Sequence, residues 1–213
     1  MRTLLGGIAV FGVLAVPGVA QAAVVSSWAL TTDAHDSADG NDGTATSVTF
    51  AGSYAVFNGT SSRISVPYNA NLSPASSNVK ATVSISTTSK PGTGDFDFDL
   101  IRSAKGTPQY KIELFPHSGK SQAQCIFVGS QNRITLPGGP SLSDGAWHTI
   151  TCTKTSKSVT LTVDGSMVAS RSITIGSITH KSGTPFSIGY KPTSGGGADF
   201  YHGKMKNVSV SIG

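Results

Sequence analysis

Asp144-Gly-Ala-Trp-His-Thr-Ile-Thr-Cys-Thr-Lys154 and the following Ser158-Val-Thr-Leu-Thr-Val-Asp-Gly165 decide the fold of this chain. The first stretch opens on an Asp-Gly turn and continues into a strand carrying Trp147, Ile150 and Cys152. The second stretch alternates apolar residues with Ser and Thr and stops at another Asp-Gly pair. A period of two is typical of strands buried on one face, so these stretches predict a β-hairpin.

The same pattern of strands and turns continues outward along the chain. Ser, Thr, Val, Ile and Gly dominate, and turn formers such as Asn58-Gly59, Pro137-Gly-Gly-Pro140 and Ser194-Gly-Gly-Gly197 separate the apolar stretches. Roughly a dozen short strands with period-two patterning favour an all-β sandwich of two sheets. No internal repeat or linker divides the sequence, so we expect one domain.

The first 22 residues read as an export signal. Arg2 precedes an apolar run over Leu4–Val16, and Ala20-Gln-Ala22 offers the small residues that signal peptidase accepts. The run is too short to cross about 30 Å of hydrocarbon as a helix. We therefore predict a signal peptide over 1–22, a mature domain over 23–213, and a secreted, extracellular protein that does not span the membrane.

The charge pattern argues against a nucleic-acid partner. Removing 22 of the 213 residues leaves 191, and because Arg2 is the only charge removed, the net charge falls from +5 to +4. Nucleic-acid binding needs Lys and Arg gathered on one face, whereas here they are scattered along the sequence. A mild preference for acidic polymers or cell surfaces is the most that this charge predicts.

The two cysteines fit an exported protein. Cys125 and Cys152 both fall in predicted strands, and an even number of cysteines in an exported chain is usually paired. A Cys/His nucleophile or a metal site would need reduced thiols, and the CxxC spacing of such sites is missing from the sequence. We predict a Cys125–Cys152 disulfide.

These segments together resemble laminin-G-like, concanavalin A-like jelly-roll domains. The similarity is greatest to small secreted laminin-G-like proteins of actinobacteria, in which two cysteines fall on the corresponding strands. It implies an all-β, two-sheet antiparallel jelly-roll sandwich. The matching motifs are the hairpin above, Trp28-Ala-Leu30, Asp36–Thr44, Ala55-Val-Phe-Asn-Gly59, Ile64-Ser-Val-Pro67, Phe186-Ser-Ile-Gly189 and Phe200-Tyr-His-Gly203.

The resemblance also assigns roles to individual residues of the motifs. It implies that Trp147 is a core residue and that His148 is a structural strand residue. Lys206 stands where the family usually has an acidic residue that often helps to hold calcium. Because an ammonium cannot ligate a hard cation, we expect no cofactor at this corner, with the ammonium in the electrostatic place of the ion.

An acidic loop near the start offers the alternative place for calcium. Asp33, Asp36, Asp39 and Asp42 supply four carboxylates within ten residues, as a hard cation requires. Their spacing does not match an EF-hand loop, and Asp and Asn are also common turn residues that hydrogen-bond their own backbone. We favour a structural loop over a metal site.

A second acidic cluster, Asp95-Phe-Asp-Phe-Asp99, raises the possibility of catalysis. Strand alternation places Asp95, Asp97 and Asp99 on one face, as in the Glu-x-Asp-x-Glu strand of related glycoside hydrolases. A retaining mechanism needs carboxyl groups about 5–5.5 Å apart, whereas the outer two Cα atoms would be about 13 Å apart. We favour ion pairs of Asp97 and Asp99 with Arg102, Lys105 or Lys111.

Aromatic residues flank the glycine-rich loop near the end of the chain. Tyr190, Tyr201 and His202 are candidates for a ligand-binding platform, because a sugar ring stacks its C–H face on an aromatic ring. Packing in the core is the alternative role, and the one we favour.

The leading hypothesis is a secreted, non-catalytic module that binds a carbohydrate or cell-surface polymer. The partner class comes from the resemblance. One alternative is a polysaccharide hydrolase or lyase that uses the Asp95–Asp99 strand. The other is an envelope domain that binds a protein.

Overall fold

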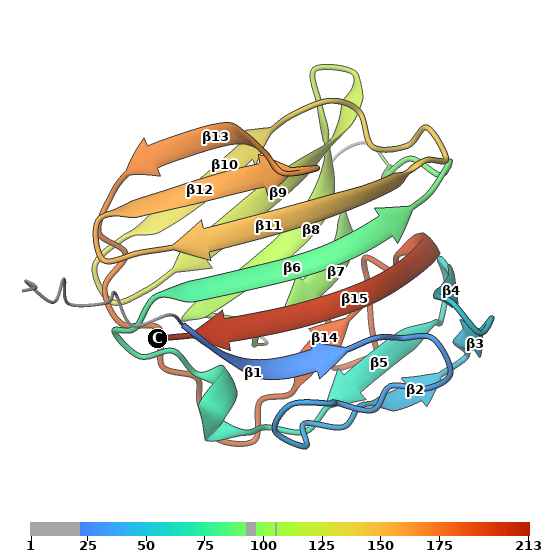
Figure 1. The fold of residues 1–213 in the computed structure, drawn as a ribbon, viewed down its shortest axis with the longest axis horizontal. Coiled ribbons are helices and arrows are strands. Elements are labelled where there is room, and N and C mark those ends of the chain that lie inside the picture. Colours follow the sequence, from blue (N-terminus) through green and yellow to red (C-terminus); the bar gives the residue numbers. More distant parts are fainter. Residues whose placement is uncertain (1–21, 93–96, 105) are drawn as a thin grey trace, which may run out of the picture.

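The computed structural model describes residues 22–92, 97–104 and 106–213 as two antiparallel β-sheets packed face to face. Figure 1 shows one sheet in front, with the strands of the other fainter behind it. No helix in the described residues is long and apolar enough to cross a membrane. Residues 1–21 of the predicted signal peptide, Asp95 and Lys105 lie outside the described residues.

The front sheet, sheet A, has eight strands, and β1 pairs with β15 beside the main path. In spatial order its strands are β13 (Ser166–Ser172), β12 (Ser158–Val163), β11 (Trp147–Lys154), β6 (Val79–Ser86), β15 (His202–Ile212), β4 (Ala55–Asn58) and β3 (Thr49–Phe50), with β1 (Ala23–Trp28) against β15.

The second sheet, sheet B, has seven strands, and a short 3-10 helix, η1 (Ala70–Leu72), connects β5 to β6. In spatial order its strands are β10 (Arg133–Gly138), β9 (Lys120–Val128), β8 (Gln109–His117), β7 (Phe98–Arg102), β14 (Phe186–Ile188), β5 (Arg63–Val66) and β2 (Thr44–Thr46).

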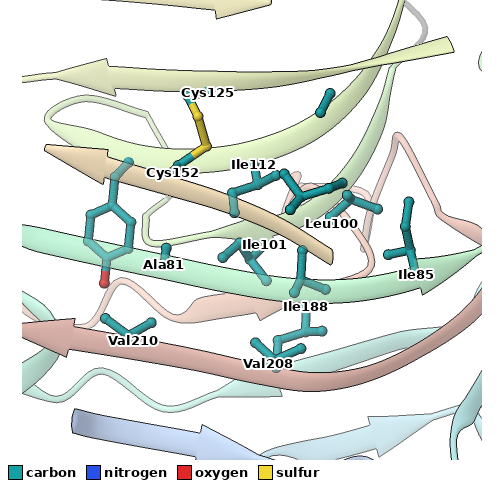
Figure 2. Close-up of a cluster of buried hydrophobic side chains, with 14 of the residues drawn as sticks. Ala81, Ile85, Leu100, Ile101, Ile112, Cys125, Cys152, Ile188, Val208 and Val210 are labelled. Carbon is teal, nitrogen blue, oxygen red and sulfur yellow. A yellow bond between two sulfur atoms is a disulfide. The ribbon is translucent and has the colours of Figure 1, made fainter. Parts of the chain in front are cut away.

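The core fills the space between the two sheets because each strand turns its apolar residues to the same side. In β12, Val159, Leu161 and Val163 are buried while the residues between them are partly exposed. Figure 2 shows the contributions of several strands to one cluster. The all-β sandwich predicted from the sequence is confirmed. Labelled members of the cluster are Ala81, Ile85, Leu100, Ile101, Ile112, Ile188, Val208 and Val210.

A bulge in β15 keeps its apolar side chains on the core side. The register with β6 shifts between Lys206 and Ser209, and Asn207 has a φ of 52°. Asn tolerates this left-handed conformation better than most residues. The extra residue lets Met205 and Val208 both face the core, although strict alternation would put them on opposite faces.

A disulfide joins the two sheets. Cys125 on β9 of sheet B is bonded to Cys152 on β11 of sheet A, so the predicted pairing is confirmed (Figure 2). Both residues are buried in the core cluster. The bond therefore ties the sheets together at a point where apolar packing already holds them.

Replacing both cysteines by Ala should lower the free energy of unfolding by about 3–4 kcal/mol, the loop-closure entropy expected for their separation of 27 residues. Urea unfolding of the two proteins at equal pH measures the difference. Reducing agent should destabilise the wild type and leave the double variant unchanged. Equal stability of the two proteins would contradict a structural role for the bond.

His180 is a buried histidine next to the core. It is 5 % exposed, and its ring centroid lies 5.7 Å from that of Tyr110. Its Nε2 has no hydrogen-bond partner among the described residues. Burial lowers the pKa of His180 to about 4, so the folded protein keeps the ring neutral.

This histidine should make the protein less stable in mild acid. The unfolded chain takes up the proton near pH 6.5, whereas the folded chain resists until about pH 4, so stability falls as the pH decreases through this window. Between about pH 7.5 and about pH 5 the free energy of unfolding should fall by about 2 kcal/mol more for the wild type than for His180→Phe. Urea unfolding at both pH values checks this, and parallel losses would contradict it.

Candidate functional site

An exposed aromatic and cationic patch lies on the outer face of sheet A. We call Tyr54, Trp147, Lys204 and Lys206 the Trp147 platform. The rings of Tyr54 and Trp147 are 5.9 Å apart between centroids. Lys206 Nζ lies 4.3 Å from the centre of the indole ring, and Lys204 Nζ lies 4.9 Å from that of Tyr54. Such distances are within the range of cation–π attraction, which holds both ammonium groups against the rings.

The position of Trp147 corrects the expectation that it belongs to the core. The residue is 37 % exposed, whereas Ile150 and Cys152 on the same strand are buried. The reason is parity, because Trp147 is an odd number of residues from Ile150 and so points to the opposite face. The spacing of Trp147 and Ile150 can be read from the sequence, but the resemblance to the family hairpin led to the opposite expectation.

Strand pairing places Trp147, Lys204 and Lys206 of the platform in two neighbouring rows across the sheet. Trp147 on β11 lies opposite Ser86 on β6, which in turn lies opposite Lys204 on β15. The next row brings Ser84 opposite Lys206, with Thr149 on the other side. The hydroxyls of Ser84 and Thr149 are 2.9 Å apart. Of these hydroxyl residues Thr149 is exposed, whereas Ser84 and Ser86 are nearly covered.

A pocket of about 310 Å³ opens beside the platform and shares Lys204 with it. His202 is exposed here, and its Nδ1 is 3.0 Å from Ser89 Oγ. Thr87 Oγ1 donates to the His202 carbonyl at 2.6 Å and holds this end of β15 in place. His202 is thus the predicted ligand residue that the structure places at an open site. The lining residues are Val56, Phe57, Ser86, Thr87, Thr88, Ser89, Gly145, His202, Gly203 and Lys204.

The other two predicted ligand residues are inside the protein, which corrects the stacking interpretation for both. Tyr201 is 0 % exposed, and its hydroxyl donates to the carbonyls of Ser86 and Lys204. Tyr190 is 4 % exposed and stacks on Phe200 with ring centroids 6.3 Å apart. A ring covered in this way has no free face for a sugar, so the role of these rings is packing.

In the hairpin of β11 and β12, His148 forms ion pairs with two aspartates, Asp144 and Asp164. His148 Nδ1 lies 2.7 Å from Asp164, and its Nε2 lies 3.0 Å from Asp144. Burial lowers the pKa of His148, but its two carboxylate partners outweigh this effect and raise it overall. These two contacts join both Asp-Gly turns of the motif to the His148 ring, in agreement with the structural role expected for this residue.

The acidic loop near the start is held by its own backbone. Asp36 is buried and accepts hydrogen bonds from four backbone amides, those of Ser27, Ala38, Asp39 and Asn41.

The other carboxylates of this loop also have protein partners. Asp33 accepts from the His35 amide, and Asp42 accepts from the Asp36 amide and contacts the His35 ring. Asp39 accepts from Asn71 at 3.4 Å. These contacts agree with the structural interpretation of the loop.

The second acidic cluster is an ion-pair network on the outer face of sheet B. Asp99 is fully buried and pairs with Arg102 Nε at 2.5 Å and with Lys111 Nζ at 3.2 Å. Lys111 Nζ also lies 3.3 Å from Asp97 and contacts Glu113, a residue that the sequence analysis did not single out. The predicted ion pairs with Arg102 and Lys111 are therefore present.

The electrostatics of this network centre on Asp97. Burial, together with a hydrogen bond and repulsion from Glu113, raises the pKa of Asp97 to about 7. Oxygens of Asp97, Asp99 and Glu113 lie within 4.8 Å of one another, a spacing that suits a cation. The Lys111 ammonium lies against all three carboxylates and supplies that positive charge from the chain itself.

Asp99→Asn should lower the free energy of unfolding by about 3 kcal/mol, because it leaves Arg102 and Lys111 buried with less negative charge. Asp42→Asn is the matched control. Asp42 pairs with His35 at the surface, where both side chains are about 60 % exposed, and the change should cost less than about 1 kcal/mol. Thermal and urea unfolding measure both variants. Similar small losses would contradict a structural role for the network.

Comparison with solved structures shows the same sandwich in several proteins. A mouse laminin alpha1 chain structure of domains LG4-5 is 20 % identical, with a TM-score of 0.54 over 74 % of this chain and 40 % of that one. Domain 4 of the Geobacillus stearothermophilus arabinanase AbnA, solved with arabinotriose, is 15 % identical, with a TM-score of 0.64 over 90 % and 93 % of the two chains.

The binding domain of Paraclostridial Mosquitocidal Protein 1 is 17 % identical, with a TM-score of 0.67 over 89 % of this chain and 48 % of that one. This chain therefore spans less than half of the laminin and mosquitocidal structures. Identities this low establish the fold alone.

No curated protein sequence matches the chain. The laminin G family model described as the concanavalin A-like lectin/glucanases superfamily matches residues 42–211, which are most of the sequence. The match covers the hairpin motif, the platform and the strands of both sheets except β1. The chain belongs to this laminin G, concanavalin A-like family.

Proposed function

We propose that this protein is a secreted, non-catalytic module that binds a carbohydrate or another cell-surface polymer through the Trp147 platform. The observation that carries the proposal is the exposed indole ring, with Lys206 over it, Lys204 over the neighbouring Tyr54 ring, and the pocket of about 310 Å³ beside them. A sugar ring stacks its C–H face on an indole, and hydroxyl and ammonium groups nearby can bond the sugar oxygens.

The size and surroundings of the site support this ligand class. Ligand pockets usually have volumes of about 300–1,000 Å³, and this pocket is at the small end, suited to one or two sugar units of a longer chain. The two lysines favour a polymer with some negative charge. The arabinotriose complex of the arabinanase domain supports the idea that this fold can present a sugar site.

The competing proposal is a polysaccharide hydrolase or lyase, and its specific support is the raised pKa of Asp97 beside Glu113. Against it, all three carboxylates of the network are nearly buried and form ion pairs with Lys111, and Asp99 also pairs with Arg102. Asp97→Asn should leave the protein's behaviour towards polysaccharides unchanged in a reducing-sugar release assay. Activity in the wild type that this variant loses would establish the enzyme instead.

Trp147→Ala should weaken binding to the retained polysaccharide at least about tenfold, equivalent to about 1.4 kcal/mol, because stacking is lost while the sheet stays intact. The measurement is binding of the purified protein to a broad glycan and polysaccharide array, with calcium and with chelator. Met167→Ala is the control, since Met167 is also exposed, at 67 %, but lies on β13 away from the platform.

Two results would contradict the proposal. If Trp147→Ala binds as the wild type does, the platform is not the site. If the array retains nothing under either condition, the carbohydrate hypothesis fails and the envelope-protein alternative takes its place. Loss of binding with chelator would show a calcium requirement despite Lys206.

A further inference from the structure

Another pocket, of about 330 Å³, is lined by Lys154, the last residue of β11, and so lies at the other end of that strand from Trp147. Apart from one glycine, the residues that line it have polar side chains, which carry hydroxyl groups, one amide and one ammonium group. The lining residues are Ser76, Ser130, Gln131, Lys154, Ser156, Thr174, Gly176 and Ser177. Such a lining can bond a polyhydroxylated ligand on several sides.

The ammonium of Lys154 is the unusual feature of this pocket. The residue is only 2 % exposed, and its Nζ donates to the carbonyls of Ser76 at 3.2 Å and Ser77 at 2.9 Å. No carboxylate lies within ion-pair distance of it among the described residues. Buried charges are normally paired, so Lys154 leaves a positive charge uncompensated beside an open pocket.

The surrounding sequence adds to this positive charge. The pocket is formed by four segments, residues 73–80, 129–133, 154–158 and 171–181, and none of them contains Asp or Glu. By contrast, the lysine of the buried network, Lys111, contacts three carboxylates. The segments around the pocket carry the cations Lys80, Arg133, Lys154, Lys157, Arg171 and Lys181.

We propose that this pocket binds the carboxylate of an acidic sugar, such as a uronic acid unit, with the Lys154 ammonium as its counter-ion. One positive charge matches one carboxylate, and the hydroxyl and amide groups of the lining match the ring hydroxyls. The volume is that of a site for one such unit. The choice of a sugar acid rests on the proposed carbohydrate-binding function, whereas the anion site itself rests on Lys154.

The pKa of the buried Lys154 should change when a ligand binds beside it. Desolvation lowers its pKa below the ordinary value, because the charged form is poorly solvated. A bound carboxylate stabilises the charged form and raises that pKa. Binding should therefore be accompanied by a measurable shift of the Lys154 signals in an NMR titration.

The test is a titration of the purified protein with sodium glucuronate, glucose and sodium acetate, followed by calorimetry and NMR. We expect glucuronate to bind with a dissociation constant of about 1 mM, acetate more weakly, and glucose without saturation. Lys154→Met should weaken glucuronate binding at least about tenfold. Lys120→Met is the control, because Lys120 is exposed at the opposite end of β9 from the pocket and does not line it, and this variant should bind as the wild type does.

A further variant keeps the test decisive if Lys154→Met does not fold. Thr174→Val retains the ammonium but removes one hydroxyl from the lining, so it should weaken glucuronate binding and leave acetate binding unchanged. Equal binding of glucose and glucuronate, or no glucuronate binding by the folded wild type, would overturn the inference. So would full glucuronate binding by a folded Lys154→Met.

Failure of this inference is distinguishable from failure of the proposed function. Trp147→Ala should lose polysaccharide binding and keep glucuronate binding, because the two sites are at opposite ends of the strand. Polysaccharide binding that survives in a protein without glucuronate binding would leave the platform intact and remove only the Lys154 site.

Discussion

The constraint on which the structure depends is the burial of one face of each sheet against the other. Apolar side chains from β6, β11, β12 and β15 meet those of β7, β8, β9 and β14, and the Cys125–Cys152 bond crosses between the sheets. Because side chains alternate along a strand, filling this core sends every second residue to the outside. The outer faces are therefore where the chain carries its polar chemistry.

The two outer faces use that freedom differently. Sheet A presents hydroxyl groups and the Trp147 platform, whose aromatic and ammonium groups are held in place by one another. Sheet B instead carries the network around Lys111, in which the charged groups pair with each other and are shielded from water. Groups engaged in this way stabilise or specify the fold, whereas exposed groups at an open pocket are available to a ligand.

In a widely shared fold, the ligand is selected by individual residues at the binding sites. The fold is shared with structures at 20 % identity or less, so it does not select a ligand. In this chain the proposed sites lie at the two ends of β11, with Trp147 at one end and Lys154 at the other. The two residues lie about 23 Å apart along the eight-residue strand and on opposite faces of sheet A, so they belong to separate sites.

The sandwich, the disulfide and the ion pairs of Asp97 and Asp99 could all be predicted from the amino-acid sequence. These follow from local rules: period-two alternation, Asp-Gly turns and the preference of a carboxylate for a nearby cation. Tertiary structure alone decided the platform and the Lys154 pocket. Tyr54, Trp147 and Lys206 are far apart in the sequence and meet only in the folded sheet. Tyr190 and Tyr201 cannot bind a ligand because other residues cover their rings. Whether a side chain is covered depends on what the rest of the chain places over it, and no local pattern of residues contains that information.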